Sequence, residues 1–141
     1  MNQAPMPRVL DRLVRAVNAH DVDALVGCFA DEFISETPAH PDRNFTGVDQ
    51  VRRNWSMIFD AVPDLTASVT SWSLDGDVIW AEWAHRGTRR DGAPHDLRGV
   101  TIMEAAAAGI GWLRFYLEPV AHDAMGATEA VREVLTSGRP A

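Results

Sequence analysis

Residues 65–88, LTASVTSWSLDGDVIWAEWAHRGT, carry the strongest fold signal in the chain. Two runs rich in β-branched and aromatic residues, 65–74 and 78–88, lie on either side of Asp75-Gly76-Asp77, which is a hairpin signal. Strands are also expected at about 95–104 and 110–120. Four alanines between these last two runs favour a helix, but the glycines that follow them favour a turn. The second half of the chain therefore predicts four sequential antiparallel strands.

Helical patterns precede these strands. Apolar residues at three- and four-residue spacing predict helices at about 9–17 and 48–61. Asp21 is typical of an N-cap, so a short second helix is expected from 22 to about 29. A short strand is expected at 33–37. This order predicts an α+β fold, with three helices on one face of a curved antiparallel or mixed sheet.

The length bounds the organisation of the chain. Its 141 residues are expected to form a single domain, with a core at about 8–120 and a C-terminal helix and tail at about 121–141.

Composition excludes several classes of protein. The net charge is −7, which argues against nucleic-acid binding through the phosphate backbone. No apolar run is long enough to span a membrane, and no secretory signal is recognisable at the N-terminus, so we expect a cytoplasmic protein. The single cysteine and five scattered histidines lack metal-ligand spacing, and phosphate-binding and dinucleotide-binding motifs are missing. Neither a metal nor a cofactor is expected.

Alternation along each strand separates an inner face from an outer face. The inner face is expected to carry Trp83, His85, Leu97, Thr101, Leu113 and Phe115. The outer face would carry Trp80, Trp112, Tyr116 and four charged residues that form cross-strand ion pairs: Glu82, Arg98, Arg114 and Glu118. The alternative reading is an arginine–carboxylate pair inside a cleft.

His85 is the leading candidate for chemistry, because imidazole titrates near neutral pH. It is either a general acid or base in a pocket or a hydrogen-bonded histidine of the core. Glu36 and His40, beside the short first strand, are weaker candidates. Trp55 and Trp83 are either core residues or walls of a ligand site.

Several segments in order, 18–25, 29–32, 45–51 and 62–65, resemble the SnoaL-like branch of the NTF2-like superfamily. The resemblance implies a cone-shaped α+β barrel in which three helices and a bent sheet enclose a deep apolar pocket. It also implies a homodimer formed through the outer face of the sheet. The pocket residues expected on this basis are Trp55, Trp83, Thr37, Phe33, Thr101, Phe115 and Phe59.

The catalytic sets of this fold are not matched. The aspartate of the isomerases is replaced by Thr37, preceded by Glu36, and the acid of the epoxide hydrolases is replaced by Phe115. One hypothesis is a cofactor-independent isomerase, cyclase or hydrolase that acts on a hydrophobic, polyketide- or terpenoid-like substrate. His85 would be its acid or base, with Glu36 or His40 at the mouth of the pocket. The alternatives are a non-catalytic carrier of a hydrophobic small molecule and a dimeric scaffold.

Overall fold

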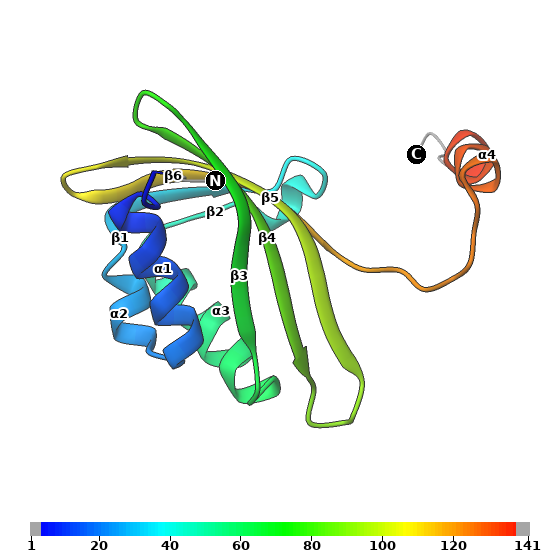
Figure 1. Cartoon of the computed structure of the whole chain (residues 1–141), viewed down its shortest axis with the longest axis horizontal. Helices are drawn as coiled ribbons and strands as arrows, with labels where there is room; N and C mark the ends of the chain where they lie inside the picture. Colours follow the sequence, from blue (N-terminus) through cyan, green and yellow to red (C-terminus); the bar gives the residue numbers. More distant parts are fainter. Residues whose placement is uncertain (1–3, 138–141) are drawn as a thin grey trace.

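In the part of the chain that the structure describes, six strands form one curved sheet in the order β2-β1-β6-β5-β4-β3 (Figure 1). The computed structural model describes residues 4–137. The helices are α1 (Arg8–Ala19), α2 (Val22–Val26), the 3₁₀ turn η1 (Pro41–Arg43), α3 (Val48–Ala61) and α4 (Ala127–Ser137). The strands are β1 (Phe29–Glu36), β2 (Phe45–Thr46), β3 (Thr66–Asp75), β4 (Val78–Thr88), β5 (Pro94–Ala106) and β6 (Gly109–Pro119).

The sheet is mixed, which confirms the α+β prediction. Strands β3 to β6 form the predicted antiparallel series, and β1 joins it by pairing in parallel with β6. The short strand β2, which the sequence did not indicate, pairs with the other edge of β1. Strands β2 and β3 stand at opposite ends of the sheet order, so the sheet is curved but is not closed into a barrel.

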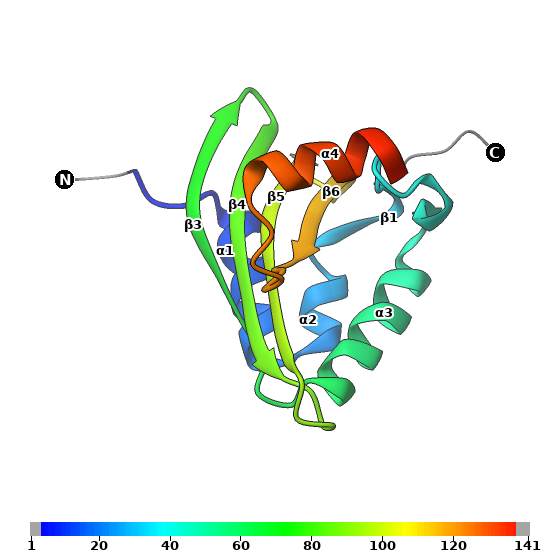
Figure 2. The ribbon, with the colours of Figure 1, turned by 90° about the vertical axis from the view of Figure 1, so that its right-hand side faces the viewer.

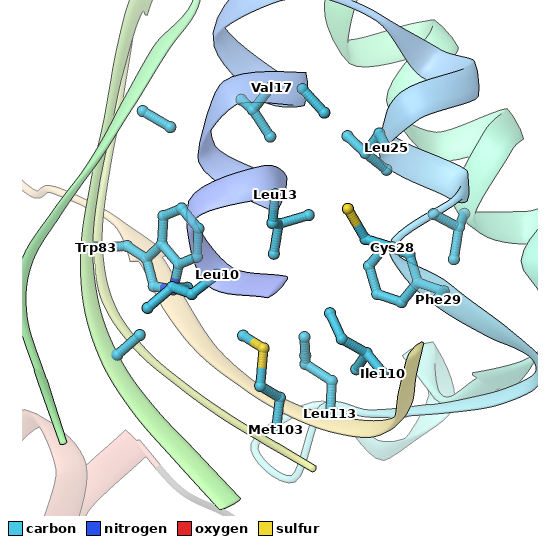
Figure 3. Close-up of a cluster of buried hydrophobic side chains, with 14 of the residues drawn as sticks. Leu10, Leu13, Val17, Leu25, Cys28, Phe29, Trp83, Met103, Ile110 and Leu113 are labelled. Atoms are coloured by element: carbon cyan, nitrogen blue, oxygen red, sulfur yellow. The ribbon is translucent and has the colours of Figure 1, made fainter. Parts of the chain in front are cut away.

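Helices α1, α2 and α3 lie on one side of the sheet, while α4 stands apart on the other (Figures 1 and 2). Leu10, Leu13 and Val17 of α1 belong to one buried core with Met103 of β5 and with Ile110 and Leu113 of β6 (Figure 3). Burial of each such side chain contributes about 1.5–3 kcal/mol. Among residues 4–137, no helix is both long and apolar enough to cross a membrane.

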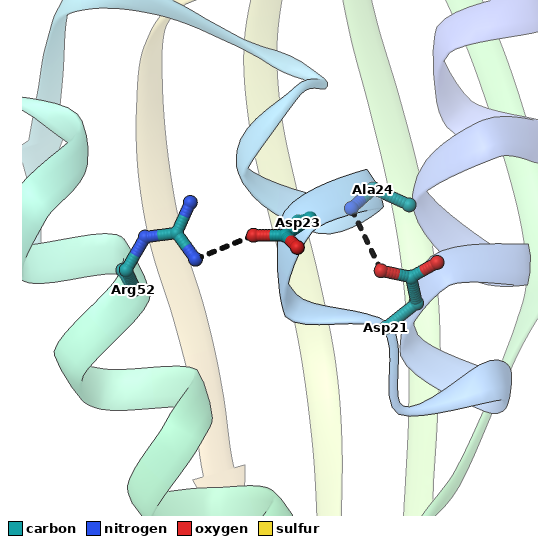
Figure 4. Close-up of polar contacts among 4 residues, drawn as sticks. All are labelled: Asp21, Asp23, Ala24 and Arg52. Atoms are coloured by element: carbon teal, nitrogen blue, oxygen red, sulfur yellow. Dashed lines mark hydrogen bonds and ion pairs between the residues drawn. The ribbon is translucent and has the colours of Figure 1, made fainter.

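Helix α2 ends earlier than its apolar periodicity predicts. The carboxylate of Asp21 accepts a hydrogen bond from the backbone N–H of Ala24, which confirms the predicted N-cap (Figure 4). The helix stops at Val26, and Phe29 already pairs with Ile110 of β6. The predicted helix end at about residue 29 is therefore wrong, because the backbone at Phe29 pairs with β6 and so cannot continue the helix.

The alanine-rich connection is a tight turn, as predicted. Ala106 and Gly109 are register partners, so two alanines form the loop. Gly109 has a φ of 110°, and a Cβ there would lie 2.8 Å from the carbonyl oxygen of Cys28. Helix α4 lies within the C-terminal segment 121–141, and the last four residues of the expected tail are outside the described residues.

The predicted division of the strands into two faces is confirmed. Trp83, His85 and Thr101 are buried on the helix-covered side, and Trp80 and Tyr116 are exposed on the other. The four outer charges do not pair with one another as expected. Their ion-pair partners are Asp96 for Arg98, Glu36 for Arg114 and His40 for Glu118, while the carboxylate of Glu82 accepts a hydrogen bond from Thr70.

Candidate functional site

A cavity of about 290 Å³ lies between the helices and the inner face of the sheet. Its walls come from α1, α3, η1 and five of the six strands, and they are mostly apolar. Ligand sites in proteins are typically concave, mostly apolar and provided with a few polar groups. The cavity has this composition and is at the small end of the usual size range.

Six of the seven expected pocket residues line this cavity. They are Phe33, Thr37, Trp55, Trp83, Thr101 and Phe115. The seventh, Phe59, is not among the lining residues. Its ring stacks on His20 at 4.5 Å between centroids and contacts Trp55 at 5.5 Å. Phe59 lies one helical turn beyond Trp55 on α3. It therefore packs against Trp55, which lines the cavity, and does not line the cavity itself.

Trp83 is held in place by a buried hydrogen bond. Its indole Nε1–H donates to the hydroxyl of Thr101 over 2.8 Å. Thr101 is the register partner of Ala81, so Trp83 and Thr101 are diagonal neighbours on the adjacent strands β4 and β5, and both are 4% exposed. A buried indole N–H normally needs a partner, so this bond orients the indole in the cavity wall.

His85 also lines the cavity and is 8% exposed. Its ring meets Trp83 edge-on at 5.5 Å and lies 6.1 Å from the ring of Trp55. Burial, and secondly the charge of His95, lower the pKa of His85 to about 4. The imidazole is therefore neutral at neutral pH, with one nitrogen able to donate a hydrogen bond and the other able to accept one.

No hydrogen bond within residues 4–137 involves the imidazole of His85. In the same range, no buried side-chain nitrogen or oxygen lacks a partner. The ring nitrogens of His85 are therefore not sealed inside the protein but are accessible from the cavity. This geometry differs from that of a core histidine saturated by backbone groups.

Four further polar residues line the cavity and were not among the sequence candidates: Ser35, Arg43, Asn54 and His95. Strand alternation could have identified Ser35, between Phe33 and Thr37, and His95, two residues before Leu97. Helical spacing from Val51 could have identified Asn54. Arg43 carries no such signal, because it lies on the 3₁₀ turn η1.

The structure does not bring Glu36 and His40 to the cavity beside His85. Glu36 alternates with the inward residues of β1, so its Oε1 lies 3.8 Å from Nε of Arg114 on the outer face. Nε2 of His40 lies 3.0 Å from Oε1 of Glu118. No aspartate or glutamate is among the residues that line the cavity in the described part of the chain. Within that part, no three histidine, cysteine or acidic residues are grouped to hold a metal ion.

The chain matches one protein family in sequence and several solved structures in fold. Residues 10–110 match the family of SnoaL-like domains. A proposed SnoaL-like polyketide cyclase from Jannaschia sp. CCS1 is 17% identical, with a TM-score of 0.67 over 98% of this chain and 100% of that one. An NTF2-like protein of unknown function from Exiguobacterium sp. 255-15 is 24% identical, with a TM-score of 0.67 over 79% of this chain and 99% of that one.

A third similar structure contains a ligand. It is RV0760c from Mycobacterium tuberculosis in complex with estradiol-17beta-hemisuccinate, which is 22% identical. Its TM-score is 0.67 over 81% of this chain and 94% of that one. At these identities the three structures show a shared fold and not a shared activity. A search of the curated proteins found no significant match.

Proposed function

The chain belongs to the SnoaL-like domain family of the NTF2-like superfamily, and from this membership and its cavity we propose that it binds a hydrophobic small molecule. The observation that carries the proposal is the lining of the cavity. Aromatic and aliphatic side chains dominate it, and an accessible, unpartnered imidazole, that of His85, is set among them. Apolar walls would supply affinity, and the few polar groups would orient the ligand.

The similar structures support this proposal by analogy. RV0760c holds estradiol-17beta-hemisuccinate, a steroid derivative, and the Jannaschia protein is a proposed polyketide cyclase. The polyketide- or terpenoid-like ligand expected from the sequence is of comparable chemical character.

Acid–base catalysis by His85 is a second candidate function. The observation that favours it is that the imidazole faces the cavity without an internal partner. With a pKa of about 4, His85 is a weak base, since a general base is most effective when its pKa is near the working pH. Glu36 and His40 are engaged elsewhere. Any such isomerase, cyclase or hydrolase would therefore rely on His85 without a carboxylate beside it.

We also propose that a second copy of the chain covers the outer face of the sheet. Ile34, Trp80 and Tyr116 are 46%, 46% and 41% exposed there, on three different strands. Arginines and glutamates alternate with them, so a two-fold axis could bring opposite charges together. Helix α4 stands off this face with Val134 73% exposed, which leaves apolar surface for the same partner (Figure 1).

The dimer is tested by light scattering coupled to gel filtration. The intact chain should elute with twice the mass of one copy, and Trp80→Glu combined with Tyr116→Glu should give the mass of one. Met57→Glu is the control, because Met57 is also an exposed apolar residue, at 63%, but lies on α3, on the other side of the sheet. A wild-type chain that stays monomeric at high concentration contradicts the proposal.

Ligand binding is tested with 2-naphthol as a neutral aromatic probe, by calorimetry and by tryptophan fluorescence. Trp55 and Trp83 line the cavity, so binding should change the emission. Phe115→Trp would place a larger ring in the cavity and should weaken binding at least about tenfold, which corresponds to 1.4 kcal/mol. Tyr116→Trp, at the next position but on the outer face, should leave binding unchanged. Equal effects of the two substitutions, or no binding by the intact chain, would refute the proposal.

A further inference from the structure

The charged and titratable residues that line the cavity are all basic. They are Arg43, His85 and His95, and no acidic residue lines it within the described residues. This contrasts with the net charge of −7 for the whole chain. A cavity that is walled by apolar groups and supplied only with cationic or neutral donors is suited to one negative charge.

The two histidines are neighbours on the inner face of the sheet. In the β4–β5 ladder, His85 pairs with Leu97 and Gly87 pairs with His95. His85 and His95 are therefore diagonal neighbours on adjacent antiparallel strands. The Cα atoms of such neighbours lie about 7–8 Å apart. Two imidazoles at this spacing can both reach one carboxylate placed between them.

Arg43 reaches the cavity from a different part of the chain. His40, at the start of the same turn, contacts Glu118, and Glu118 is the register partner of Arg98 on β5. The contact between His40 and Glu118 thus holds the turn that carries Arg43 near Arg98, three residues after His95 on β5. Within residues 4–137, the guanidinium of Arg43 and the imidazoles of His85 and His95 have no hydrogen bond or ion pair, so all three are available to a ligand.

We propose that the ligand is a hydrophobic carboxylate whose anionic group binds between Arg43, His95 and His85, while its apolar body lies against Trp55 and Trp83. This inference rests on the proposed function and adds the chemical class of the ligand. The guanidinium offers paired donors to a carboxylate, and each histidine offers one N–H. Asn54, in the wall on α3, offers a further polar contact.

An anion between the two imidazoles would change the electrostatic environment of both rings. Burial and the charge of His95 lower the pKa of His85, and burial and the charge of Arg89 lower the pKa of His95. Asp96 acts against this on His95, but it lies on the outer face and pairs with Arg98. A carboxylate between the two imidazoles would stabilise their protonated forms and raise both pKa values.

The test compares 2-naphthoate with 2-naphthamide, which has the same aromatic body and no charge. Calorimetry on the full chain should show that the carboxylate binds at least about tenfold more tightly, as expected for 1.4 kcal/mol from charge-assisted hydrogen bonds. Its advantage should grow as the pH falls from about 8 to about 6, because the bound histidines take up protons. In NMR spectra, the titration of His85 should move to higher pH when 2-naphthoate is bound.

Three variants locate the anion. Arg43→Gln and His95→Gln should each remove most of the preference for 2-naphthoate and leave the affinity for 2-naphthamide unchanged. Arg98→Gln, at an exposed position on the outer face of β5, is the matched control and should change neither affinity. An unchanged preference in Arg43→Gln and His95→Gln would overturn the placement of the carboxylate.

The remaining outcomes separate this inference from the proposed function. If the amide binds as tightly as the carboxylate, the anionic class is refuted and the hydrophobic binding site stands. If neither naphthalene compound binds and 2-naphthol also fails to bind, the proposed function is refuted and this inference fails with it.

Discussion

Thr101→Val removes the acceptor of the hydrogen bond from Trp83 and keeps nearly the same side-chain volume. The bond is 2.8 Å long, and both residues are 4% exposed. Loss of the hydroxyl leaves the indole N–H without its partner in a buried position, which costs about 1–3 kcal/mol. The substitution should therefore lower the free energy of unfolding by about 2 kcal/mol, which for a domain of this size is a fall in Tm of several degrees.

The assay is urea unfolding followed by far-UV circular dichroism, since fluorescence would report on Trp83 itself. A double-mutant cycle isolates the bond: in a Trp83→Phe background, Thr101→Val should cost less than about 0.5 kcal/mol, because no indole N–H is left unpaired. Thr101→Ser is the control that keeps the hydroxyl. An equal cost of Thr101→Val in both backgrounds would refute the role assigned to this hydrogen bond.

Three further predictions concern the core, a close backbone contact and the buried imidazole. Leu10→Ala should cost about 2–5 kcal/mol in urea unfolding, because Leu10 is fully buried, whereas Leu74→Ala at a 55% exposed position should cost less than about 0.5 kcal/mol. Gly99→Ala should destabilise the chain by at least about 2 kcal/mol, because a Cβ there would lie 2.1 Å from the carbonyl oxygen of Tyr116 and because Gly99 has a φ of 151°. Gly111→Ala is the control and should have little effect, since no atom lies within 4 Å of a Cβ at that position. Because the pKa of His85 is lowered from 6.5 to about 4, the unfolded chain binds the proton more tightly, so stability should fall by up to about 3 kcal/mol as the pH drops from 6.5 to 4. His85→Gln should lack this part of the pH dependence, and identical pH profiles for the two proteins would contradict the burial argument.

Local patterns in the sequence are sufficient for the element types and for the faces of the strands. The alternation in 78–88 places Trp83 and His85 on the inner face, and the helical spacing in 48–61 places Trp55 on the same side. Asp21 marks the start of α2, because an N-cap depends only on the residues within one turn. These features could be predicted because the side-chain period of a helix or strand is a local property.

Contacts between distant segments could not be predicted in this way. The parallel pairing of β1 with β6 joins residues about eighty positions apart, and it ends α2 before Phe29. The same packing turns Glu36 toward Arg114 and His40 toward Glu118, away from His85.

The sequence by itself determined an α+β chain with an apolar inner face and with His85 on that face. Only the tertiary structure decided that Arg43, His85 and His95 line one cavity, and that no carboxylate of the described residues lines it with them. The physical reason is that periodicity specifies the side of an element on which a residue lies. The neighbours of that residue depend instead on strand order, on register and on where a turn such as η1 packs against the sheet.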